Sequence, residues 1–226
     1  MSKFFNSRMY LFILAISFLI ISCSKESPKT AGNKINSEAS KSGVVTRQIL
    51  NVYAKADKFK NKTGKMEMDC SMAKDMKLTW WWDNNGRKEA VLLETPKERN
   101  MFLVDSSGTT SYNLETNQGL KQKSPGGAFG YLSELSGVLS ACESEVGKNK
   151  LVVAIEDKVI INKKCKGYKV IGASGLDNVN AWLFDGIPMR IEIDMGNKVI
   201  FEAKSLETDI TITSENFLIP KSVKLK

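Results

Sequence analysis

Residues 65–86 read KMEMDCSMAKDMKLTWWWDNNG, and the alternation of their side chains decides the fold. Apolar residues occupy every second position in two runs, at Met66, Met68, Cys70 and Met72 and then at Met76, Leu78, Trp80 and Trp82. This period of two is typical of β-strands that bury one face. The Asp-Asn-Asn-Gly sequence at 83–86 is a strong turn signal. The stretch therefore predicts two adjacent strands, most simply a hairpin, and a reversal into a third strand over 87–94.

The strand pattern continues toward the C-terminus, and helical spacing occurs in one stretch before it and in one stretch that interrupts it. Further strands are predicted at 101–104, 110–114, 151–155, 159–162, 168–172, 181–184, 188–194, 199–203, 209–213 and 217–223. The helical stretches run from Val45 to Phe59 and from Phe129 to Cys142. Many consecutive strands joined by turns indicate a mainly antiparallel sheet. We expect an α+β fold, with residues 44–226 as a single domain in which a strongly curved antiparallel half-barrel sheet wraps two or more helices.

The composition excludes several classes of enzyme. The chain has 226 residues, with 33 Lys and Arg, 25 Asp and Glu and no histidine, so its formal net charge is +8. Without histidine there is no Ser-His-Asp or Cys-His pair and no His-ligated zinc or haem. The acidic pairs Glu143/Glu145 and Glu156/Asp157 are typical of solvated surface positions. We expect no catalytic residue, no metal and no organic cofactor. Because the lysines are scattered without interleaved aromatics, we do not expect nucleic-acid binding either.

The N-terminus has the features of a targeting sequence. Lys3 and Arg8 precede an apolar run from Met9 to Ile21, which is shorter than the about 20 residues that a spanning helix needs. The following Ile-Ile-Ser-Cys sequence resembles a bacterial lipobox, whose cysteine is acylated after cleavage. Residues 1–22 are therefore predicted to be a lipoprotein signal peptide, and Cys23 the lipidated residue. Residues 23–43 are polar enough to form a flexible tether. Because Ser24 rather than Asp follows Cys23, the lipid anchor is expected in the outer membrane, facing the periplasm.

Three stretches resemble motifs of one family of envelope proteins. They are LVDSSGTTSYN at Leu103–Asn113, LFDGIPMRI at Leu183–Ile191 and ENFLIPKSV at Glu215–Val223. In this order they resemble the periplasmic and outer-membrane lipoprotein-carrier superfamily, typified by LolA and LolB. The resemblance covers nearly all of residues 44–226. It implies a half-open antiparallel sheet with helices on its concave side, and a partner that is an apolar ligand or a lipidated protein. Arg87 lies near a position where family members carry a functional arginine, but its flanking residues do not match, so that role is not transferred.

The methionine and tryptophan stripe is the candidate ligand site. We expect a ligand-binding role for Met66, Met68, Met72, Met76, Leu78, Trp80 and Trp82, because methionine adapts to varied apolar partners and indoles can line a cavity. The alternative is an ordinary packed core. Two functions follow: a membrane-anchored carrier or acceptor of apolar ligands, or an envelope sensor or structural interaction lipoprotein with a filled core.

Two further features leave alternatives open. Trp81 points away from Trp80 and Trp82, so it either docks to a partner or to lipid headgroups, or is covered by a neighbouring loop. Beyond Cys23, three cysteines remain, at 70, 142 and 165. An oxidising envelope permits one disulfide among them with one thiol left over.

Overall fold

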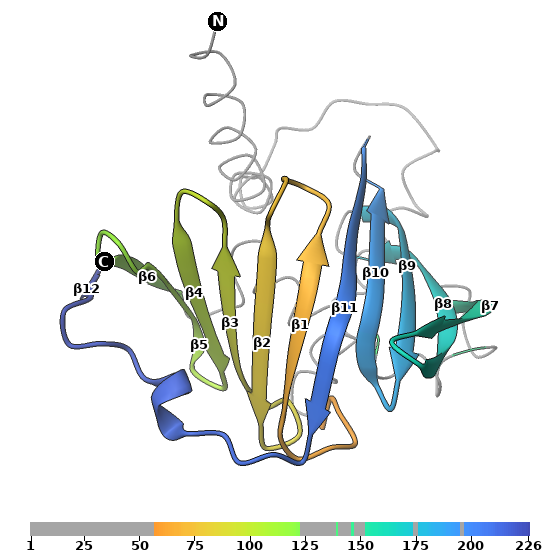
Figure 1. Cartoon of the computed structure of the whole chain (residues 1–226), viewed down its shortest axis with the longest axis horizontal. Helices are drawn as coiled ribbons and strands as arrows, with labels where there is room; N and C mark the ends of the chain where they lie inside the picture. Colours follow the sequence, from red (N-terminus) through yellow and green to blue (C-terminus); the bar gives the residue numbers. More distant parts are fainter. Residues whose placement is uncertain (1–56, 123–138, 140–145, 147–151, 174–175, 195–196) are drawn as a thin grey trace, which may run out of the picture.

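The computed structural model describes residues 57–122, 139, 146, 152–173, 176–194 and 197–226. These residues form one open twelve-stranded sheet in the order β12-β6-β5-β4-β3-β2-β1-β11-β10-β9-β8-β7 (Figure 1). Its strands are β1 (Gly64–Cys70), β2 (Lys77–Asp83), β3 (Lys88–Glu94), β4 (Arg99–Asp105), β5 (Gly108–Asn113), β6 (Gln118–Gln122), β7 (Val152–Ile160), β8 (Lys163–Ala173), β9 (Leu176–Phe184), β10 (Ile187–Asp194), β11 (Lys198–Thr208) and β12 (Lys224–Leu225). All neighbouring pairs are antiparallel except β12 and β6.

The hairpin of β1 and β2 is confirmed. Met66 lies opposite Trp80 and Met68 opposite Leu78, so the two apolar rows face the same side. The turn between β2 and β3 is also confirmed. There Asn84, Asn85 and Gly86 all have positive φ, at 53°, 57° and 81°. Asparagine and glycine adopt this conformation more easily than other residues, which is why the sequence turns here.

The sheet consists of two meanders that meet at one long-range pair. β1–β6 follow one another through hairpins, as do β7–β11, and β1 then pairs with β11. Met66 lies opposite Leu206 in this pair, and the register shifts between Glu67 and Met68. The last residues of the chain return to β6 as β12. The strands at both ends of the sheet turn away from the plane of β1–β3 (Figure 1).

One face of the sheet is apolar from β3 to β8 apart from Glu89, and we call it the apolar face. The residues named in the next sentence lie opposite one another from strand to strand and are each less than 9% exposed. They are Val91 and Leu93 of β3, Leu78, Trp80 and Trp82 of β2, Met66, Met68 and Cys70 of β1, Phe201 and Ala203 of β11, Ile191 and Ile193 of β10, Val179 and Ala181 of β9, and Tyr168 and Val170 of β8. Alternate residues point to the opposite face. This burial supplies most of the stabilisation of the described sheet.

The expectation of an α+β fold that wraps two or more helices is wrong. The described residues are almost entirely one open β-sheet, and their regular helical structure is limited to the 3-10 helix η2 (Ser214–Phe217) and to Leu139. The expected helix ending at Phe59 does not extend over residues 57–59. The Phe59 amide instead donates a hydrogen bond to the carbonyl of Asn85, at 3.2 Å. The remainder of that stretch, and Phe129–Cys142 apart from Leu139, lie outside the described residues. None of the described helical segments is long and apolar enough to cross a membrane.

Several strand boundaries also differ from the prediction. The separate strands expected at 151–155 and 159–162 form one strand, β7, which carries an irregularity between Ile155 and Lys158. The strands expected at 209–213 and 217–223 are absent from those residues, where the chain leaves the sheet. Asp209 has a positive φ of 56° and begins the departure. β6 was not expected, because its sequence QGLKQ lacks an apolar alternation.

Candidate functional site

The structure brings together six of the seven predicted ligand-binding residues. Their exposed fractions are 1% for Met66, 2% for Met68, 7% for Met76, 2% for Leu78, 2% for Trp80 and 0% for Trp82. Met72 is separated from them, because it lies in the turn between β1 and β2 and is 43% exposed. The six form the centre of the apolar face. Whether they bind a ligand remains a prediction.

Phe59, which precedes β1, packs on the two inward tryptophans. Its ring centroid lies 5.0 Å from that of Trp82 and 6.1 Å from that of Trp80, and both contacts are edge-on. The Trp82 indole donates a hydrogen bond of 3.3 Å to the carbonyl of Asn61. Gly64 allows the Trp82 ring to lie against β1, since a Cβ at this position would be 2.1 Å from the ring. These contacts fix both rings at one end of the apolar face.

A charged group lies within this otherwise apolar region. Glu89 of β3 is 1% exposed, and its carboxylate accepts a hydrogen bond of 3.1 Å from the Trp80 indole. The Lys58 ammonium forms an ion pair with the same carboxylate. A buried carboxylate requires such partners, because an unpaired charge in an apolar environment is strongly unfavourable. Sequence reasoning missed this group. The sequence does place this acidic residue in the same inward-facing row of β3 as Val91 and Leu93, and that position could have identified it.

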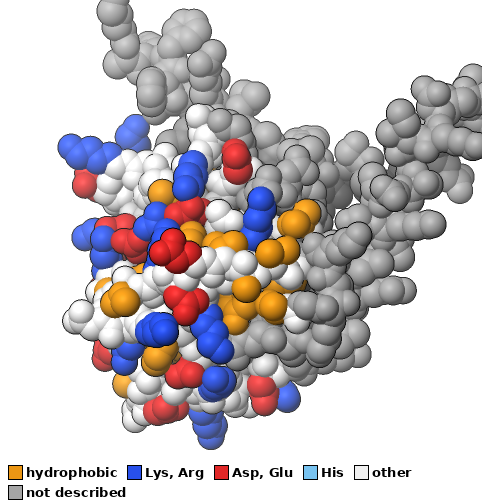
Figure 2. Space-filling model, turned by 90° about the vertical axis from the view of Figure 1, so that its right-hand side faces the viewer, with side chains coloured by type: hydrophobic (Ala, Val, Ile, Leu, Met, Phe, Trp, Pro, Cys, Tyr) orange, Lys and Arg blue, Asp and Glu red, His pale blue; other side chains and the backbone are white. Residues whose placement is uncertain are grey.

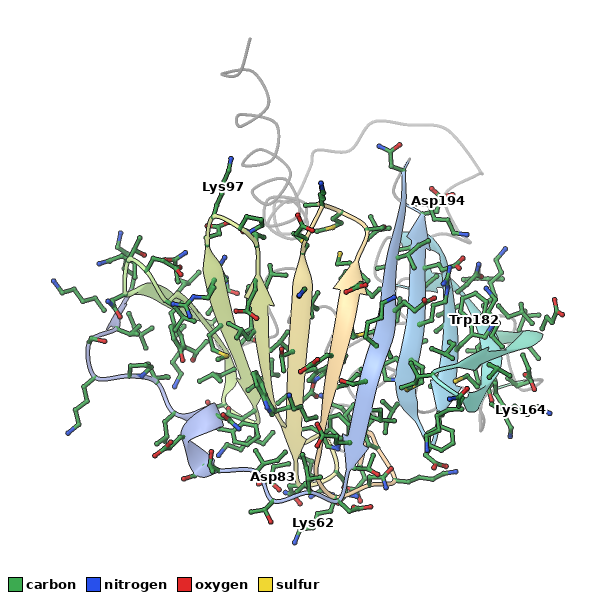
Figure 3. All side chains as sticks on the ribbon, in the orientation of Figure 1. Lys62, Asp83, Lys97, Lys164, Trp182 and Asp194 are labelled. Carbon is green, nitrogen blue, oxygen red and sulfur yellow. The ribbon has the colours of Figure 1, made fainter. Side chains whose placement is uncertain are left out.

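Trp81 and Trp182 lie on the opposite face. Trp81 is half-buried there, and its docking to a partner remains a prediction. Trp182 is 4% exposed and is covered by cations, with the Lys158 ammonium 3.8 Å and the Arg190 guanidinium 5.8 Å from its ring centroid. Its indole donates a hydrogen bond of 2.9 Å to the carbonyl of Glu156. Figure 3 shows Trp182 among the strands at the β7 end of the sheet.

Three cations converge on one carboxylate beside Trp182. Arg190, Lys198 and Lys158 approach Glu192 to 2.7, 2.6 and 3.7 Å, and Glu192 is 5% exposed. Burial raises the pKa of Glu192, but the hydrogen bonds from Lys198 and Arg190 outweigh it, so the pKa lies below its ordinary value. Glu202 forms a second ion pair with Arg190. This cluster ties β7, β10 and β11 together on the opposite face.

The β7 end of the molecule has a surface of mixed character. Figure 2 shows basic and acidic side chains interspersed on this side, with hydrophobic side chains among them. The exposed large hydrophobic residues of β7 and β8 are Val153, Val159 and Ile171. The described part of this side carries both signs of charge, so it is not a uniformly basic surface.

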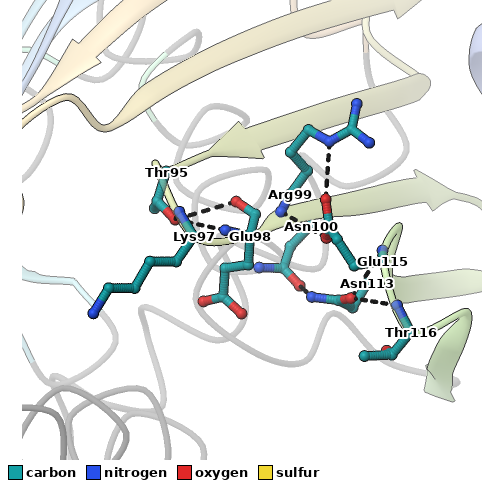
Figure 4. Close-up of polar contacts among 8 residues, drawn as sticks. All are labelled: Thr95, Lys97, Glu98, Arg99, Asn100, Asn113, Glu115 and Thr116. Carbon is teal, nitrogen blue, oxygen red and sulfur yellow. Dashed lines mark hydrogen bonds and ion pairs between the residues drawn. The ribbon is translucent and has the colours of Figure 1, made fainter.

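The turns near β6 are held by a compact set of polar contacts (Figure 4). The Glu115 carboxylate accepts two hydrogen bonds of 2.9 Å from Arg99, one from the backbone amide and one from Nε. The Asn113 side chain accepts hydrogen bonds from the amides of Glu115 and Thr116, and donates one of 3.2 Å to Asn100. Every partner belongs to the β3–β4 turn, to the β5–β6 turn or to the adjoining strand ends, so the contacts have a structural explanation.

The described cysteines are not reactive groups. Cys70 and Cys165 are both buried and carry free thiols. Burial raises the pKa of the Cys165 thiol to about 11 and also raises that of Cys70. Cys142 and the predicted lipidation residue Cys23 lie outside the described residues. Among the residues that the structure describes, no three His, Cys, Asp or Glu side chains are grouped so that they could hold a metal ion.

Comparison with known proteins identifies a shared fold. No protein-family model and no curated protein matches the sequence. Among solved structures, an uncharacterised conserved protein from Thermus thermophilus is similar with a TM-score of 0.54 and 9% sequence identity, covering 82% of this chain and 98% of that one. At this identity the similarity concerns the fold alone.

Two further structures score lower. MucB has a TM-score of 0.46 at 12% identity, covering 79% of this chain, and the match spans 64% of the length of MucB. A putative outer membrane lipoprotein-sorting protein domain from Vibrio parahaemolyticus has a TM-score of 0.32 at 12% identity, covering 80% of this chain and 97% of that one. Scores of this size are not evidence for a shared function.

Proposed function

We propose that this chain is a membrane-anchored envelope lipoprotein that binds an apolar ligand against the apolar face of its sheet, as a non-catalytic carrier or acceptor. The observation that carries this proposal is the extended apolar face from β3 to β8, with the ion-paired Glu89 within it, on an open sheet. The ligand would be a lipid, an acyl chain or a lipidated protein. The sequence resemblance to the lipoprotein-carrier superfamily supports the same class of ligand.

Hydrophobic burial is sufficient to drive such binding. Transfer of an acyl chain from water to an apolar surface is favourable by about 0.8 kcal/mol per buried methylene and requires no covalent step. The methionines at the centre suit this role because their flexible side chains repack around ligands of different shape. Met66 and Met68 lie side by side with Leu78 and Trp80 across the hairpin, where such repacking would be needed.

The membrane anchor is a separate part of the proposal. Cys23 would carry the acyl groups, and the chain would reside in the outer membrane, facing the periplasm. Growing cells with an alkyne fatty acid should label the wild type and leave Cys23→Ala unlabelled. Equal labelling of both forms would disprove lipidation at this residue and leave the ligand-binding proposal to be tested on its own.

A second function is favoured by one specific observation. Met66, Met68, Trp80 and Trp82 are at most 2% exposed, as expected of a filled core. The chain would then act as an envelope sensor or structural interaction protein, which uses its outer surface. This function predicts a protein that keeps its fold and binds no lipid.

Native mass spectrometry separates the two functions. The full chain is purified from bacterial envelopes and examined for a co-purified lipid of defined mass, with titration of a fluorescent fatty acid as the second measurement. The carrier function predicts a bound lipid or saturable fatty-acid binding. A folded chain with neither would reject the carrier function and favour the second one.

A further inference from the structure

The last residues of the chain lie at the β6 end of the sheet, far from β7 (Figure 1). β12 runs parallel to β6, with Leu225 opposite Gly119. The Lys226 amide donates a hydrogen bond of 3.1 Å to the Gly119 carbonyl, and the Lys121 amide donates one of 3.4 Å to the Lys226 carbonyl. Residues that are far apart in the sequence therefore share one edge. We call the surface of β6 and residues 218–226 the tail edge.

The segment between η2 and β12 is held on the same strands by hydrogen bonds. The Tyr112 hydroxyl of β5 donates a hydrogen bond of 3.4 Å to the Leu218 carbonyl. The Ser222 hydroxyl donates one of 3.0 Å to the Asn117 side chain in the β5–β6 turn. Residues 218–226 therefore have a defined place on the sheet.

The tail edge exposes a group of large hydrophobic residues. In the described part of the chain eight such residues are exposed, and four of them lie here: Leu120, Leu218, Ile219 and Leu225, at 44, 58, 36 and 40%. Leu225 and Leu120 point to different sides of the edge. Leu225 Cδ2 lies 2.9 Å from where a Cβ of Gly119 would be, and Leu120, as the next residue of β6, points the other way. A group of exposed hydrophobic residues indicates an interaction surface, whereas a single one does not.

Basic side chains lie among these hydrophobic residues. The tail edge has four exposed lysines, which are Lys121, Lys221, Lys224 and Lys226. Neither β6 nor residues 218–226 contain Asp or Glu. Among the described residues, none of the ion pairs includes one of these four lysines. Glu115 in the adjoining β5–β6 turn is ion-paired with Arg99. The surface therefore combines four positive side chains with four exposed hydrophobic ones.

The β7 edge, at the other end of the sheet, has a different character. β7 exposes Val153 and Val159, but its exposed charged residues are Glu156, Asp157 and Lys158, which carry both signs. Both edges thus expose apolar side chains, and the tail edge adds a charge of one sign. A surface of this kind is complementary to a negatively charged partner.

The chemistry of the tail edge fits a lipid bilayer better than other negatively charged partners. Anionic headgroups attract lysines, and the boundary with the acyl chains accepts leucine and isoleucine side chains. Nucleic acids are bound with the help of stacking aromatic residues, and neither β6 nor residues 218–226 contain an aromatic residue. A rigid protein surface contacts one side of a sheet edge. A fluid bilayer can surround both sides, as the opposite directions of Leu120 and Leu225 require.

We propose that the tail edge docks on an anionic lipid bilayer, with its lysines at the headgroups and its leucines at the boundary with the acyl chains. This goes beyond the proposed function, because it needs no ligand on the apolar face. It adds a second membrane contact to the proposed anchor at Cys23. The two contacts together orient the sheet with its β6 end toward the bilayer and its β7 end away from it.

The test compares two positions on the full chain reconstituted with vesicles. An environment-sensitive fluorophore is attached to Leu225→Cys, or to the matched control Val159→Cys, which lies on the β7 edge and is 73% exposed in the native protein. The unsubstituted chain, treated with the same reagent, gives the background from the native cysteines. The vesicles consist of phosphatidylcholine alone or of an equal mixture with phosphatidylglycerol, and they contain a spin-labelled lipid that quenches a fluorophore in the bilayer.

The Leu225 probe should be quenched in the anionic vesicles, and the Val159 probe should be quenched in neither kind. Lys224→Ser/Lys226→Ser, added to the Leu225 probe, should lower the ratio of docked to undocked chain about 25-fold. The reason is that each lysine near an anionic surface contributes a factor of roughly five. Lys62→Ser/Lys164→Ser removes the same charge at positions away from the tail edge (Figure 3) and should leave the ratio unchanged. The substituted lysines are exposed, so their replacement spares the fold.

Several outcomes would overturn the inference. They are absent quenching of the Leu225 probe, equal quenching at the two positions, equal quenching in neutral and anionic vesicles, and an equal effect of the two lysine double variants. Flotation with the vesicles separates these outcomes from a failure of the anchor. A chain that floats without quenching at Leu225 keeps the anchor and rejects the docking surface. A chain that does not float with anionic vesicles rejects both.

Discussion

The Trp80 indole donates a hydrogen bond to the Glu89 carboxylate within the apolar face, and Lys58, in the segment before β1, is ion-paired with that same carboxylate. β2, β3 and the segment before β1 are thus joined through one buried charge. Buried ion pairs contribute little net stability, but removal of one partner is strongly unfavourable. This asymmetry leads to the first prediction.

Replacing Lys58 alone should destabilise the protein more than replacing both members of the pair. Lys58→Met removes the ammonium that is ion-paired with the buried Glu89 carboxylate and should lower the free energy of unfolding by about 3 kcal/mol. Lys58→Met/Glu89→Met should recover much of this loss. Denaturant unfolding of both single variants and the double variant measures the coupling. If the double variant is as unstable as the two single losses added together, the pair is not coupled.

The apolar face can be examined by paired substitutions. As packed core, Trp80→Ala should lower the free energy of unfolding by about 3–5 kcal/mol, and Met68→Trp by about 1–3 kcal/mol through overpacking. Trp81→Ala, on the half-buried opposite face, should have a smaller effect. If the face holds a ligand, Met68→Trp should block fluorescent fatty-acid binding while sparing most of the stability. Large losses of stability with unchanged binding would mean that the face is ordinary core.

Acid should weaken the cluster on the opposite face through Glu192. The pKa of this carboxyl is lowered in the folded state, so the folded protein favours its ionised form. The corresponding stability is present at neutral pH and is lost as the pH falls below about 4. Glu192→Gln should be less stable at pH 7 by about 1.5–3 kcal/mol and should lose less stability on acidification than the wild type.

Chemical unfolding from pH 7 to pH 3 provides the measurement for Glu192. The exposed Glu215 lies outside the cluster, and Glu215→Gln serves as the control, which should follow the wild-type profile. The interpretation fails if Glu192→Gln and the wild type lose stability in parallel over the whole pH range.

The buried thiols should be inert in the native protein. Because the pKa of Cys165 is raised to about 11 and both Cys70 and Cys165 are buried, alkylating reagents at pH 8 should modify neither residue until the protein unfolds. Peptide mass spectrometry after labelling, with and without denaturant, resolves the two sites. Rapid labelling of Cys165 under native conditions would show that β8 opens locally or that its thiol is accessible.

Local sequence pattern was sufficient for the hairpin but not for the elements that depend on distant partners. Local residues alone explain both the alternation over Met66–Trp82 and the turn at Asp83–Gly86. Both elements were therefore predicted correctly. β6 has no such alternation and exists because it pairs with β5 and β12. Phe59 has helical spacing from Val52 and Ala56, yet it hydrogen-bonds to Asn85, packs on Trp82 and lies outside any helix. Tertiary contacts overrode the periodicity there.

The same distinction applies to the candidate site. The inward row of β1 and β2 could be read from the sequence because it alternates, and only Met72 failed, since the strand ends at Cys70. Glu89 could have been noticed as a charge in an apolar row. Its pairing with Lys58, 31 residues away, depends on how the segment before β1 packs against the sheet and has no local signal.

The junction of β1 with β11 has a consequence for the order of folding. Pairs within each meander join residues close in the sequence and close small loops, whereas the junction sets Gly64 opposite Thr208 and must close a loop through most of the chain. We therefore expect the strands within each meander to pair first, and the pairing of β1 with β11 to be the rate-limiting step of folding. The refolding rate, more than the unfolding rate, should then respond to substitutions along this junction.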